Sequence, residues 1–471
     1  MSYKLPDRDK KIYFIGIGGA GMSAIAYVLL KMGYSVSGSD KALNTMTARI
    51  AKNGGKVYLG HKKENVKGAD IIVISTAITP DNCEYKKALE DNIPIWHRAD
   101  MLSALMNDKI SIAIAGTHGK TTTTSMTALL LEKSGLDPTS IIGGELEDIG
   151  GNSKLGSGKY LVAEADESDG SFLKMNPDYV IITNMEADHL DYYKNYENIK
   201  DAFSRFIRSV RKDGKGFLCY DDIELRKLGK ELKRNTISYG IENEESDIIA
   251  KNIKILEEGS EFDVLVNNKI LGKLRLNIPG LHNIVNSLGV IGVGLETGIK
   301  FSDIAQILPM YRGVRRRFQL KGKVDDVYIY DDYAHHPTEI RATLKAAKGF
   351  RQGTIKRLVV IFQPHRYSRT FHLYQEFGKA FGDADVLILT DIYSAGEQPI
   401  ENVDGESIYK EAIKSGHKDV KYMPEKDKIA DYLLDIIQDG DLVITMGAGD
   451  VWKVGEELID KLPKRQNASS L

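Results

Sequence analysis

Cysteine and net charge are both scarce in this chain. Its 471 residues include two cysteines, Cys83 and Cys219, and 64 Lys and Arg residues nearly balance 66 Asp and Glu residues, for a formal net charge of −2. Two distant cysteines suggest no disulfide framework and fit a reducing compartment, so we expect each to be a small buried hydrophobic residue. The balanced charge provides no basic field that would argue for a nucleic-acid partner.

Long hydrophobic runs are missing too. No apolar stretch reaches the length of a membrane span, and the opening residues MSYKLPDRDKK lack the apolar core of a signal peptide. We therefore expect no membrane insertion and a cytoplasmic location. The hydrophobic fraction of 42% and the charged fraction of 28% are typical of a soluble globular protein, and the length suggests about three domains.

The most informative segment runs from Ile110 to Ser125, ISIAIAGTHGKTTTTS. An apolar, β-branched run ends in the loop GTHGKT (116–121), and a helical pattern follows over Thr122 to Lys133. Such a loop directs backbone N–H groups and the positive end of the helix dipole at an anion. Lys120 adds a charge where β- and γ-phosphates would lie, and the Thr121 hydroxyl is placed to hold Mg²⁺. The segment predicts a loop that binds a nucleoside triphosphate.

This loop departs from the general phosphate-loop pattern. A match to G-x-x-x-x-G-K-[ST] would need glycine where Ile114 stands. The alternative interpretation is a glycine turn with a solvated lysine.

A second glycine-rich turn, GIGGAG (16–21), follows the first apolar strand and opens a helix predicted over Met22 to Lys31. Its glycines fit a tight turn and the close approach of a pyrophosphate, and Asp40 ends the next strand near the spacing of a ribose-binding acid. Taken alone, the turn indicates a dinucleotide-binding dehydrogenase. Any diphosphate-linked nucleotide, including a UDP-sugar, meets the same demands, and a purely structural β–α turn fits as well.

The order strand, polar turn, helix begins three times, at residues 11–17, 110–115 and 327–332. Strands that alternate with helices indicate parallel sheets with crossover helices. Between residues 235 and 276, short alternating strands predict a small antiparallel sheet at the edge of the second segment. We predict an α/β protein of three domains, the first and third Rossmann-like and the central one a P-loop ATPase with a parallel sheet plus the small antiparallel sheet.

Polar residues end two further strands of the central segment. Glu164 begins the run EADESD, and carboxylates at a strand end near a phosphate loop suit Mg²⁺, although a charged run is also typical of a solvated face. The run NMEADH ends with His189, which could ligate a second cation, bind substrate or be structural. Asn283 and Asn286 share one face of a predicted helix, where paired amides suit the edge of adenine or cap the helix.

The third segment carries arginines and histidines at its strand ends. Residues 315–317 are RRR, which could bind phosphate oxygens or form a solvated linker. The run DDYAHHPTE (331–339) could hold a ribose or position a substrate, and it lacks the further ligands of a zinc site. Arg366 and Arg369, in QPHRYSRT, could grip a small carboxylate.

Eight motifs follow one another in a fixed order: GIGGAGMS, AGTHGKTTT, EADESDGSF, NMEADHLD, PGLHNIVN, DDYAHHPTE, QPHRYSRT and MGAGD. With them the chain resembles the Mur ligase family over nearly its whole length, and within it most closely the members that join L-alanine to UDP-N-acetylmuramate. The resemblance implies a UDP-sugar-binding domain at residues 1–107, an ATP-binding domain at 108–321 and an amino-acid- and ATP-binding domain at 322–471. It displaces the dehydrogenase interpretation.

The activity that the resemblance implies is an ATP-dependent ligation in peptidoglycan precursor synthesis. A lactyl carboxylate attacks the γ-phosphate, and the amine of L-alanine then attacks the resulting acyl phosphate. The alternative is a recycling ligase of the same family that adds a preformed tripeptide. ATP and Mg²⁺ are the implied cofactors, UDP-N-acetylmuramate and L-alanine the substrates, and we expect a monomer or a weak homodimer.

The resemblance also implies roles for individual residues. The catalytic set is Lys120, His189, Arg366 and Arg369, and the metal ligands are Thr121, Glu164 and His189. The nucleotide contacts are Gly116, Thr117, His118, Gly119, Lys120, Thr121, Thr122, Asn283, Asn286, Arg317 and Asp331. The substrate contacts are Gly16, Gly18, Gly19, Gly21, Met22, Asp40 and His365.

Overall fold

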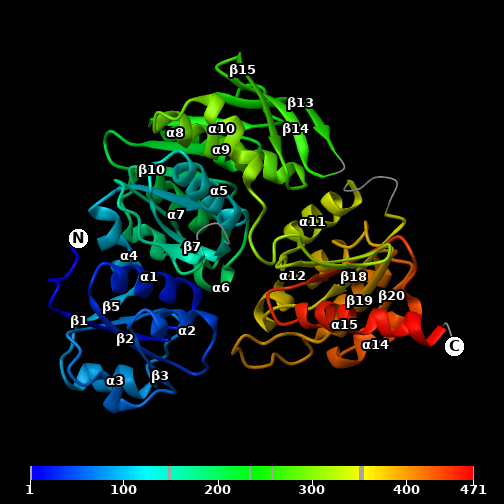
Figure 1. The fold of residues 1–471 in the computed structure, drawn as a ribbon, viewed down its shortest axis with the longest axis horizontal. Coiled ribbons are helices and arrows are strands. Elements are labelled where there is room, and N and C mark those ends of the chain that lie inside the picture. Colours follow the sequence, from blue (N-terminus) through cyan, green and yellow to red (C-terminus); the bar gives the residue numbers. More distant parts are fainter. Residues whose placement is uncertain (1–2, 147–149, 233–234, 257, 350–354, 470–471) are drawn as a thin grey trace. The chain divides into compact units, whose positions relative to one another are not determined.

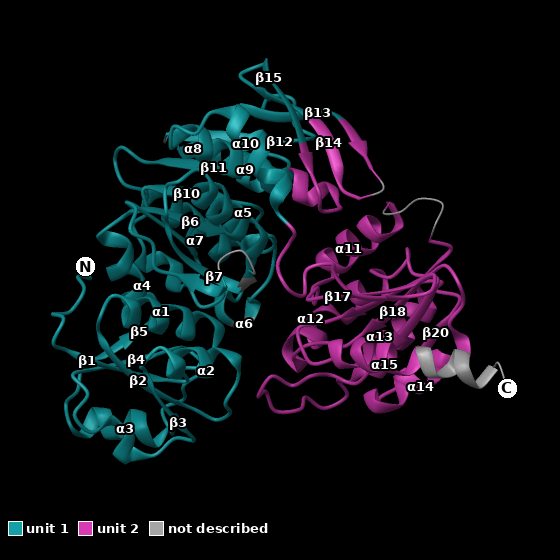
Figure 2. Ribbon diagram, viewed as in Figure 1, with its two compact units in different colours: residues 1–252, 263–274, 285–311 teal, residues 253–262, 275–284, 312–471 magenta. Residues whose placement is uncertain are grey.

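Three β-sheets organise the chain in the computed structural model, which describes residues 3–146, 150–232, 235–256, 258–349 and 355–469 (Figure 1). Contacts divide the chain into two compact units (Figure 2). The first comprises residues 1–252, 263–274 and 285–311, and the second comprises residues 253–262, 275–284 and 312–471.

The first sheet is parallel and has the strand order β3-β2-β1-β4-β5. Its strands are β1 (Lys11–Ile15), β2 (Ser35–Asp40), β3 (Lys56–Leu59), β4 (Ile71–Ile74) and β5 (Ile95–His97), and its helices are α1 (Ala20–Lys31), α2 (Thr45–Lys52), α3 (Cys83–Glu90) and α4 (Arg98–Asn107), with the short 3-10 helix η1 (Lys63–Val66). The order reverses between β1 and β4, and ligands of open α/β sheets bind outside the carboxyl ends at such a point. The glycine-rich turn after β1 lies there.

The second sheet has ten strands in the order β15-β14-β13-β12-β11-β10-β6-β9-β7-β8. The strands are β6 (Ile110–Ala115), β7 (Thr139–Leu146), β8 (Gly151–Lys154), β9 (Tyr160–Glu164), β10 (Tyr179–Ile182), β11 (Lys215–Cys219), β12 (Thr236–Gly240), β13 (Ile248–Ile255), β14 (Ser260–Val266) and β15 (Lys269–Leu276). Its helices are α5 (Lys120–Lys133), α6 (Leu190–Tyr193), α7 (Tyr196–Arg208), α8 (Ile223–Leu232), α9 (Leu281–Glu296) and α10 (Phe301–Ile307), with the 3-10 helices η3 (Ser171–Lys174) and η4 (Leu308–Met310).

Strand β6 lies between β9 and β10, and all three are parallel. Their carboxyl ends therefore meet at one edge of the sheet. The phosphate loop follows β6, the run EADESD begins at the end of β9, and the run NMEADH follows β10. The topology thus gathers three motifs that lie far apart in the sequence.

The predicted alternating strands at residues 235–276 are present and extend the ten-stranded sheet through β12. Asn267 and Asn268 join β14 to β15, and both have positive φ, 49° and 62°. Two successive positive φ angles form the tight turn that joins antiparallel strands.

The third sheet has the order β16-β17-β21-β18-β19-β20, with β16 antiparallel to β17 and the other neighbouring strands parallel. Its strands are β16 (Gln319–Val324), β17 (Val327–Asp332), β18 (Arg357–Phe362), β19 (Val386–Leu389), β20 (Val420–Tyr422) and β21 (Asp441–Met446). The helices are α11 (Pro337–Gly349), α12 (Tyr367–Gly378), α13 (Gly405–Lys414), α14 (Ile429–Ile436) and α15 (Trp452–Ser469), with the 3-10 helix η5 (Lys426–Lys428).

Both faces of this third sheet are buried. Tyr328 and Tyr330 of β17 pack in one hydrophobic cluster, whereas Val327 and Ile329 pack in another. Because successive side chains of a strand point to opposite faces, helices must cover both sides. The predicted boundary at residue 321 falls within β16.

Three details differ from the sequence-based expectations or extend them. Cys219 is buried as expected, but Cys83 is exposed, and that expectation was wrong. Cys83 is the first residue of α3, where a helix end faces solvent. Helices α1 and α5 begin at Ala20 and Lys120, two residues before the predicted starts. Within the described ranges, no helix combines the length and the apolar character that a membrane crossing needs.

Candidate functional site

The glycine-rich turn after β1 is closed by the neighbouring strand β2. The amides of Gly16 and Ile17 both donate to the carbonyl of Ser39, at 2.8 and 3.0 Å. Asp40 accepts a 2.8 Å hydrogen bond from the Gly18 amide, and a Cβ on Gly18 would lie 2.9 Å from the same carboxylate oxygen. Asp40 therefore holds the turn itself in place. Gly19, Gly21 and Met22 lie at the start of α1, where helix amides and the helix dipole attract anions.

The phosphate loop is fixed by the chain that follows β10. Asn184 accepts from the His118 amide through Oδ1 at 2.8 Å and from the Thr117 amide through its carbonyl at 3.2 Å. The Thr183 hydroxyl donates to the His118 carbonyl at 2.5 Å. Gly116 has φ of 132°, and a Cβ there would lie 2.1 Å from Thr183 Oγ1. Glycine at 116 is thus required for this close approach.

Lys120 is the first residue of α5, and its ammonium is surrounded by acceptors. Nζ lies 2.6 Å from the Gly116 carbonyl, 3.1 Å from the Thr117 carbonyl and 2.7 Å from Glu167 Oε1. Burial alone would lower the pKa of this lysine, but the carboxylates of Glu167, Asp166 and Glu164 together raise it above its ordinary value. The loop therefore contains a fixed positive charge at neutral pH.

The acidic residues after β9 divide between several partners. Glu164 Oε1 accepts from the Gly143 amide at 2.8 Å, and a Cβ on Gly143 would lie 2.5 Å from Glu164 Oε2. Asp166 pairs with Arg98. Glu167 pairs with Lys120 through Oε1, while its Oε2 is buried and accepts no hydrogen bond from any described residue. An orphaned, buried carboxylate oxygen beside the phosphate loop fits a bound cation.

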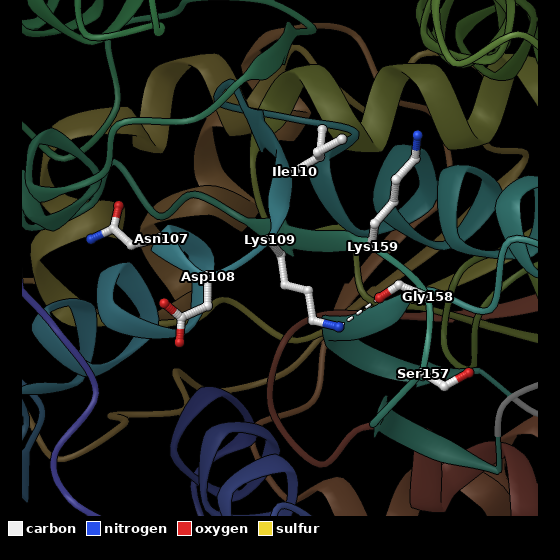
Figure 3. Close-up of a pocket in the computed structure, with 7 residues that line it drawn as sticks. All are labelled: Asn107, Asp108, Lys109, Ile110, Ser157, Gly158 and Lys159. Atoms are coloured by element: carbon white, nitrogen blue, oxygen red, sulfur yellow. Dashed lines mark hydrogen bonds between the residues drawn. The ribbon is translucent and has the colours of Figure 1, made fainter.

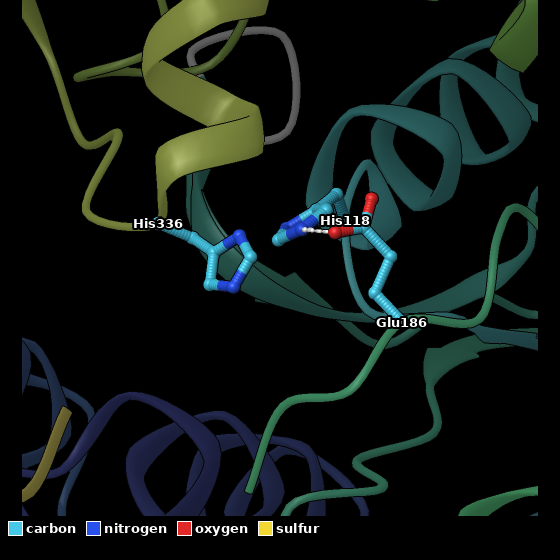
Figure 4. Close-up of side chains that lie close together, drawn as sticks. All are labelled: His118, Glu186 and His336. Atoms are coloured by element: carbon cyan, nitrogen blue, oxygen red, sulfur yellow. Dashed lines mark ion pairs between the residues drawn. The ribbon is translucent and has the colours of Figure 1, made fainter. Parts of the chain in front are cut away.

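The run after β10 lies on the other side of the loop. His118 and Glu186 point toward one another (Figure 4), with Nε2 of the histidine 3.6 Å from Oε2 of the glutamate. The Glu186 amide donates to Thr117 Oγ1 at 2.9 Å. His189 has φ of 54° and precedes α6, with Nε2 3.5 Å from Asp188 Oδ2. Thr121 and Thr122 occupy the first turn of α5.

The two asparagines of α9 are both buried. Asn283 donates to the Pro279 carbonyl at 2.6 Å, a local contact of the helix start. Asn286 lies against the phosphate loop, since a Cβ on Gly119 would be 2.8 Å from Asn286 Oδ1. Gly119 has φ of 82°, which favours glycine. The structure thus places Asn286 next to the loop.

In the second unit, Asp331 is buried, and both of its carboxylate oxygens accept hydrogen bonds from other side chains of the unit. Arg316 Nε lies 2.9 Å from Asp331 Oδ2, and the Thr445 hydroxyl donates to Oδ1 at 2.8 Å. Arg317 contacts Glu339 at 3.4 Å and the Tyr333 ring at 5.4 Å from its centroid. Burial, together with the Arg317 charge, lowers the pKa of nearby His282 to about 4.

His365, Arg366 and Arg369 come together at the end of β18 and the start of α12. The His365 ring stacks on Tyr393 with a centroid distance of 5.7 Å, and Arg369 Nη1 lies 3.3 Å from His365 Nδ1. Arg366 has φ of 74° and lies 3.8 Å from Glu397 Oε1. Burial and the positive groups around it lower the pKa of His365 to about 3, so this imidazole is neutral.

Sequence reasoning did not single out four residues of these clusters: Arg98, Glu167, Asn184 and Glu397. Glu167 and Asn184 stand inside motifs that were recognised, three residues after Glu164 and at the start of NMEADH. Both residues follow the end of a β-strand, and this position is the sequence feature that could have identified them as site residues. Arg98 and Glu397 lie in no recognised motif, and nothing in their sequence context marked them.

A shallow hollow of about 390 Å³ lies elsewhere on the first unit (Figure 3). Its lining includes Lys109 and Ile110, and Lys109 Nζ donates to the Gly158 carbonyl at 2.5 Å. Ile110 begins β6, whereas the phosphate loop follows the other end of that strand. The hollow is therefore separate from the candidate site.

Comparison with known proteins covers nearly the whole chain. Three family models match: "Mur ligase family, catalytic domain" at residues 11–110, "Mur ligase middle domain" at 114–294 and "Mur ligase, glutamate ligase domain" at 316–449. Two curated relatives are named UDP-N-acetylmuramate–L-alanine ligase. That of Pelotomaculum thermopropionicum is 49% identical over 98% of this chain and 99% of its own length. That of Geotalea uraniireducens is 50% identical over 96% of this chain and 98% of its own length.

Solved structures agree with these matches. The UDP-N-acetylmuramate-alanine ligase of Thermotoga maritima has a TM-score of 0.81 and 30% identity, and the similarity covers 96% of this chain and 99% of that one. A murein peptide ligase of Psychrobacter arcticus has a TM-score of 0.72 and 25% identity, with 96% and 98% covered. The predicted three-domain α/β fold is confirmed. The chain belongs to the Mur ligase family.

Proposed function

We propose that this chain joins L-alanine to UDP-N-acetylmuramate, coupled to the cleavage of ATP to ADP and phosphate, in the synthesis of peptidoglycan precursors. The observation that carries the proposal is the identity of about one half, over nearly the full chain, to relatives that are named for this reaction. The phosphate loop supports the proposal, because the Lys120 ammonium provides a positive charge where phosphates would bind.

The first chemical step joins two anions, the lactyl carboxylate and the γ-phosphate of ATP. The Lys120 ammonium offsets their repulsion and stabilises the charge that spreads over the phosphoryl oxygens. Glu167 keeps this ammonium in position, 2.7 Å away. The amides of Gly116, Thr117, His118 and Gly119, with the hydroxyls of Thr121 and Thr122, would line the phosphates.

Residues of the first unit fit a bound Mg²⁺. Thr121, Glu164 and His189 would hold it, and the buried Oε2 of Glu167 adds negative charge nearby. The cation would neutralise charge on the β- and γ-phosphates. The oxygen atoms of Thr121 and Glu164 are the hard donors that Mg²⁺ prefers.

For the nucleotide itself we propose Asn283, Asn286, Arg317 and Asp331 as contacts. Asn286 lies against Gly119, so its amide group is already close to the phosphate loop. Asp331 is hydrogen-bonded to Arg316 and Thr445, and a ribose contact would have to share or replace one of these bonds.

The sugar nucleotide would bind at the turn after β1, through Gly16, Gly18, Gly19, Gly21 and Met22, while Asp40 shapes the turn. L-Alanine would bind at His365, Arg366 and Arg369. Two guanidinium groups suit a carboxylate, and a neutral His365 adds no charge that could repel the ammonium of the incoming amino acid. Once this ammonium has lost a proton, the free amine can attack the carbonyl carbon of the acyl phosphate and release phosphate.

For the organisation of the chain, we propose domains at residues 1–107, 108–321 and 322–471, a cytoplasmic location, and a monomer or weak homodimer. These three statements rest on the sequence interpretation and on the family.

The decisive experiment is phosphate release by the purified protein, combined with the mass of the product. We expect release only when ATP, Mg²⁺, UDP-N-acetylmuramate and L-alanine are all present, and a product heavier than the sugar nucleotide by one alanyl residue. Equal release without sugar or amino acid would refute the proposal. Preference for a preformed tripeptide over L-alanine in a competition assay would instead assign the recycling reaction.

A further inference from the structure

Arg98 connects two parts of the first unit that the proposed function assigns to different substrates. It is the first residue of α4, directly after β5. Its Nη2 pairs with Asp166, in the acidic run beside Lys120. Its Nη1 faces the start of α1, because a Cβ on Gly21 would come within 3.1 Å of that nitrogen. A side chain at position 21 would be in tight contact with the guanidinium and would displace it by a few tenths of an ångström.

The Arg98 guanidinium has more N–H donors than Asp166 uses. Among the described residues, its one hydrogen bond goes to Asp166, although an arginine side chain carries five N–H groups. The side chain is largely buried, with 19% exposed. Water or a bound ligand can therefore accept hydrogen bonds from the donors that Asp166 leaves unused.

Two positive features also meet at this point. The start of α1 presents backbone amides and the positive end of the helix dipole. Arg98 adds a full positive charge beside it. Asp166 compensates part of this charge through its ion pair with Arg98. The guanidinium N–H groups that Asp166 does not use are therefore suited to bind an anion at the start of α1.

We propose that Arg98 binds the anionic part of the sugar nucleotide. This inference rests on the proposed function, which places that substrate at the turn after β1. The substrate carries two anionic groups, a diphosphate and a lactyl carboxylate, and a guanidinium fork recognises either one. Because Arg98 is also tied to Asp166, the residue before Glu167, it fixes the substrate relative to the loop that carries Lys120.

The fold around Arg98 does not depend on it alone. The Ser103 hydroxyl of α4 donates to the Lys174 carbonyl at 2.9 Å, and Lys174 Nζ lies 2.8 Å from Asp100 Oδ1. These contacts tie α4 to the central segment further along the helix. A substitution at Arg98 should therefore leave α4 in place.

The test is equilibrium binding by calorimetry, without ATP or alanine, of UDP, UDP-N-acetylglucosamine and UDP-N-acetylmuramate. We expect Arg98→Gln to weaken UDP-N-acetylmuramate binding roughly 10- to 100-fold, the range for a lost hydrogen bond to a charged group. An equal loss for all three ligands assigns the contact to the diphosphate. A loss confined to UDP-N-acetylmuramate assigns it to the carboxylate. Affinity for UDP-N-acetylmuramate within about twofold of wild type overturns the inference.

Two further variants separate ligand binding from a structural bridge. Asp166→Ala removes the bridge but keeps the cation, so we expect sugar-nucleotide affinity to be retained. Arg49→Gln is a matched control, since Arg49 Nη2 donates to the Ser153 carbonyl at 2.8 Å and also joins the two segments. If either variant lost as much affinity as Arg98→Gln, Arg98 would be a bridge and the inference would fail. Wild-type protein that bound none of the three ligands would refute the proposed function, and the inference with it.

Discussion

Lys120 and Glu167 form an ion pair in which Nζ lies 2.7 Å from Oε1, with 19% of the lysine side chain and 4% of the glutamate side chain exposed. The same ammonium also donates to the Gly116 and Thr117 carbonyls. Phosphate oxygens carry charge and are stronger acceptors than these carbonyls. We therefore expect the ammonium to exchange the carbonyls for ATP oxygens while Glu167 keeps it in position.

Lys120→Ala should abolish turnover and leave the sugar-nucleotide site intact. The variant loses the cation that opposes the repulsion between carboxylate and γ-phosphate, so we expect phosphate release to fall at least roughly a hundredfold. Calorimetry should show unchanged binding of UDP-N-acetylmuramate. Lys133→Ala, at the exposed end of the same helix, is the control and should keep full activity. Loss of sugar binding in Lys120→Ala would contradict the assignment of the two sites.

Glu167→Gln should move the alkaline limb of the pH–rate profile to lower pH. In the wild-type protein the carboxylates raise the pKa of Lys120, so the ammonium keeps its proton through the neutral and mildly alkaline range. Without Glu167 the effect of burial dominates and that pKa falls. Activity should then be lost as pH rises through the lowered pKa.

The same variant should be less stable, because it leaves a buried charge without its partner. We expect the free energy of unfolding to fall by about 3 kcal/mol. Glu132→Gln is the matched control, since Glu132 pairs with Lys154 at the other end of α5 at 2.5 Å. An alkaline limb that coincides for Glu167→Gln and Glu132→Gln would show that Glu167 does not set the charge of Lys120.

Much of this site was predictable because its parts are local. An apolar strand, the glycine turn GTHGKT and a helix follow one another along the chain, and the order of parallel strands brings the next two strand ends to the same edge. The contacts between these parts were not predictable. Arg98 and Asp166 are 68 residues apart, and only the packing of α4 on the central segment brings them together.

The sequence also did not predict which carboxylate pairs with Lys120. The strand end favoured Glu164, but the chain turns directly afterwards, with the Ser168 amide donating to Asp166 Oδ1 at 3.0 Å. This turn brings Glu167 back to the ammonium. Strand β16 escaped prediction for another reason: QLKGKV is an edge strand without a buried residue, so it has no apolar run to reveal it.

Gly116→Ala should disable the phosphate loop. A methyl group there would lie 2.1 Å from Thr183 Oγ1 and 3.0 Å from the Asn184 carbonyl, so the loop or the β10 end must shift. A displacement of about 1 Å at a catalytic loop can cost roughly a hundredfold in rate. Gly135→Ala is the control: its φ is also positive, 76°, but nothing lies within 4 Å. It should lower stability by about 1 kcal/mol and keep the rate. Equal rates for the two variants would contradict the tight fit at Gly116.

L-Alanine binding should show no titration of His365. Burial, together with His335, Arg369, Arg366 and Arg316, lowers the pKa of His365 from its ordinary 6.5 to about 3. A group whose pKa is lowered this far loses its proton well below neutral pH, so the imidazole stays neutral from about pH 5 upwards. The KM for L-alanine should therefore pass through the ordinary histidine range without a step. A step near 6.5 that disappears in His365→Gln would show that this histidine carries a proton during binding.

Arg369→Ala should raise the KM for L-alanine and spare the other substrates. Arg369 lies one helical turn after His365, with Nη1 3.3 Å from His365 Nδ1. The substitution removes a positive charge from the proposed carboxylate site. It also removes the neighbour that orients the His365 imidazole. A lost charge-assisted hydrogen bond corresponds to roughly a 10- to 100-fold increase in KM. Arg341→Ala is the control in the same unit, because Arg341 is exposed on α11 and contacts the Thr338 hydroxyl at 3.3 Å. Steady-state kinetics with each substrate varied in turn separates the outcomes. A rise in the KM for ATP or UDP-N-acetylmuramate, with the KM for L-alanine unchanged, would remove Arg369 from the amino-acid site.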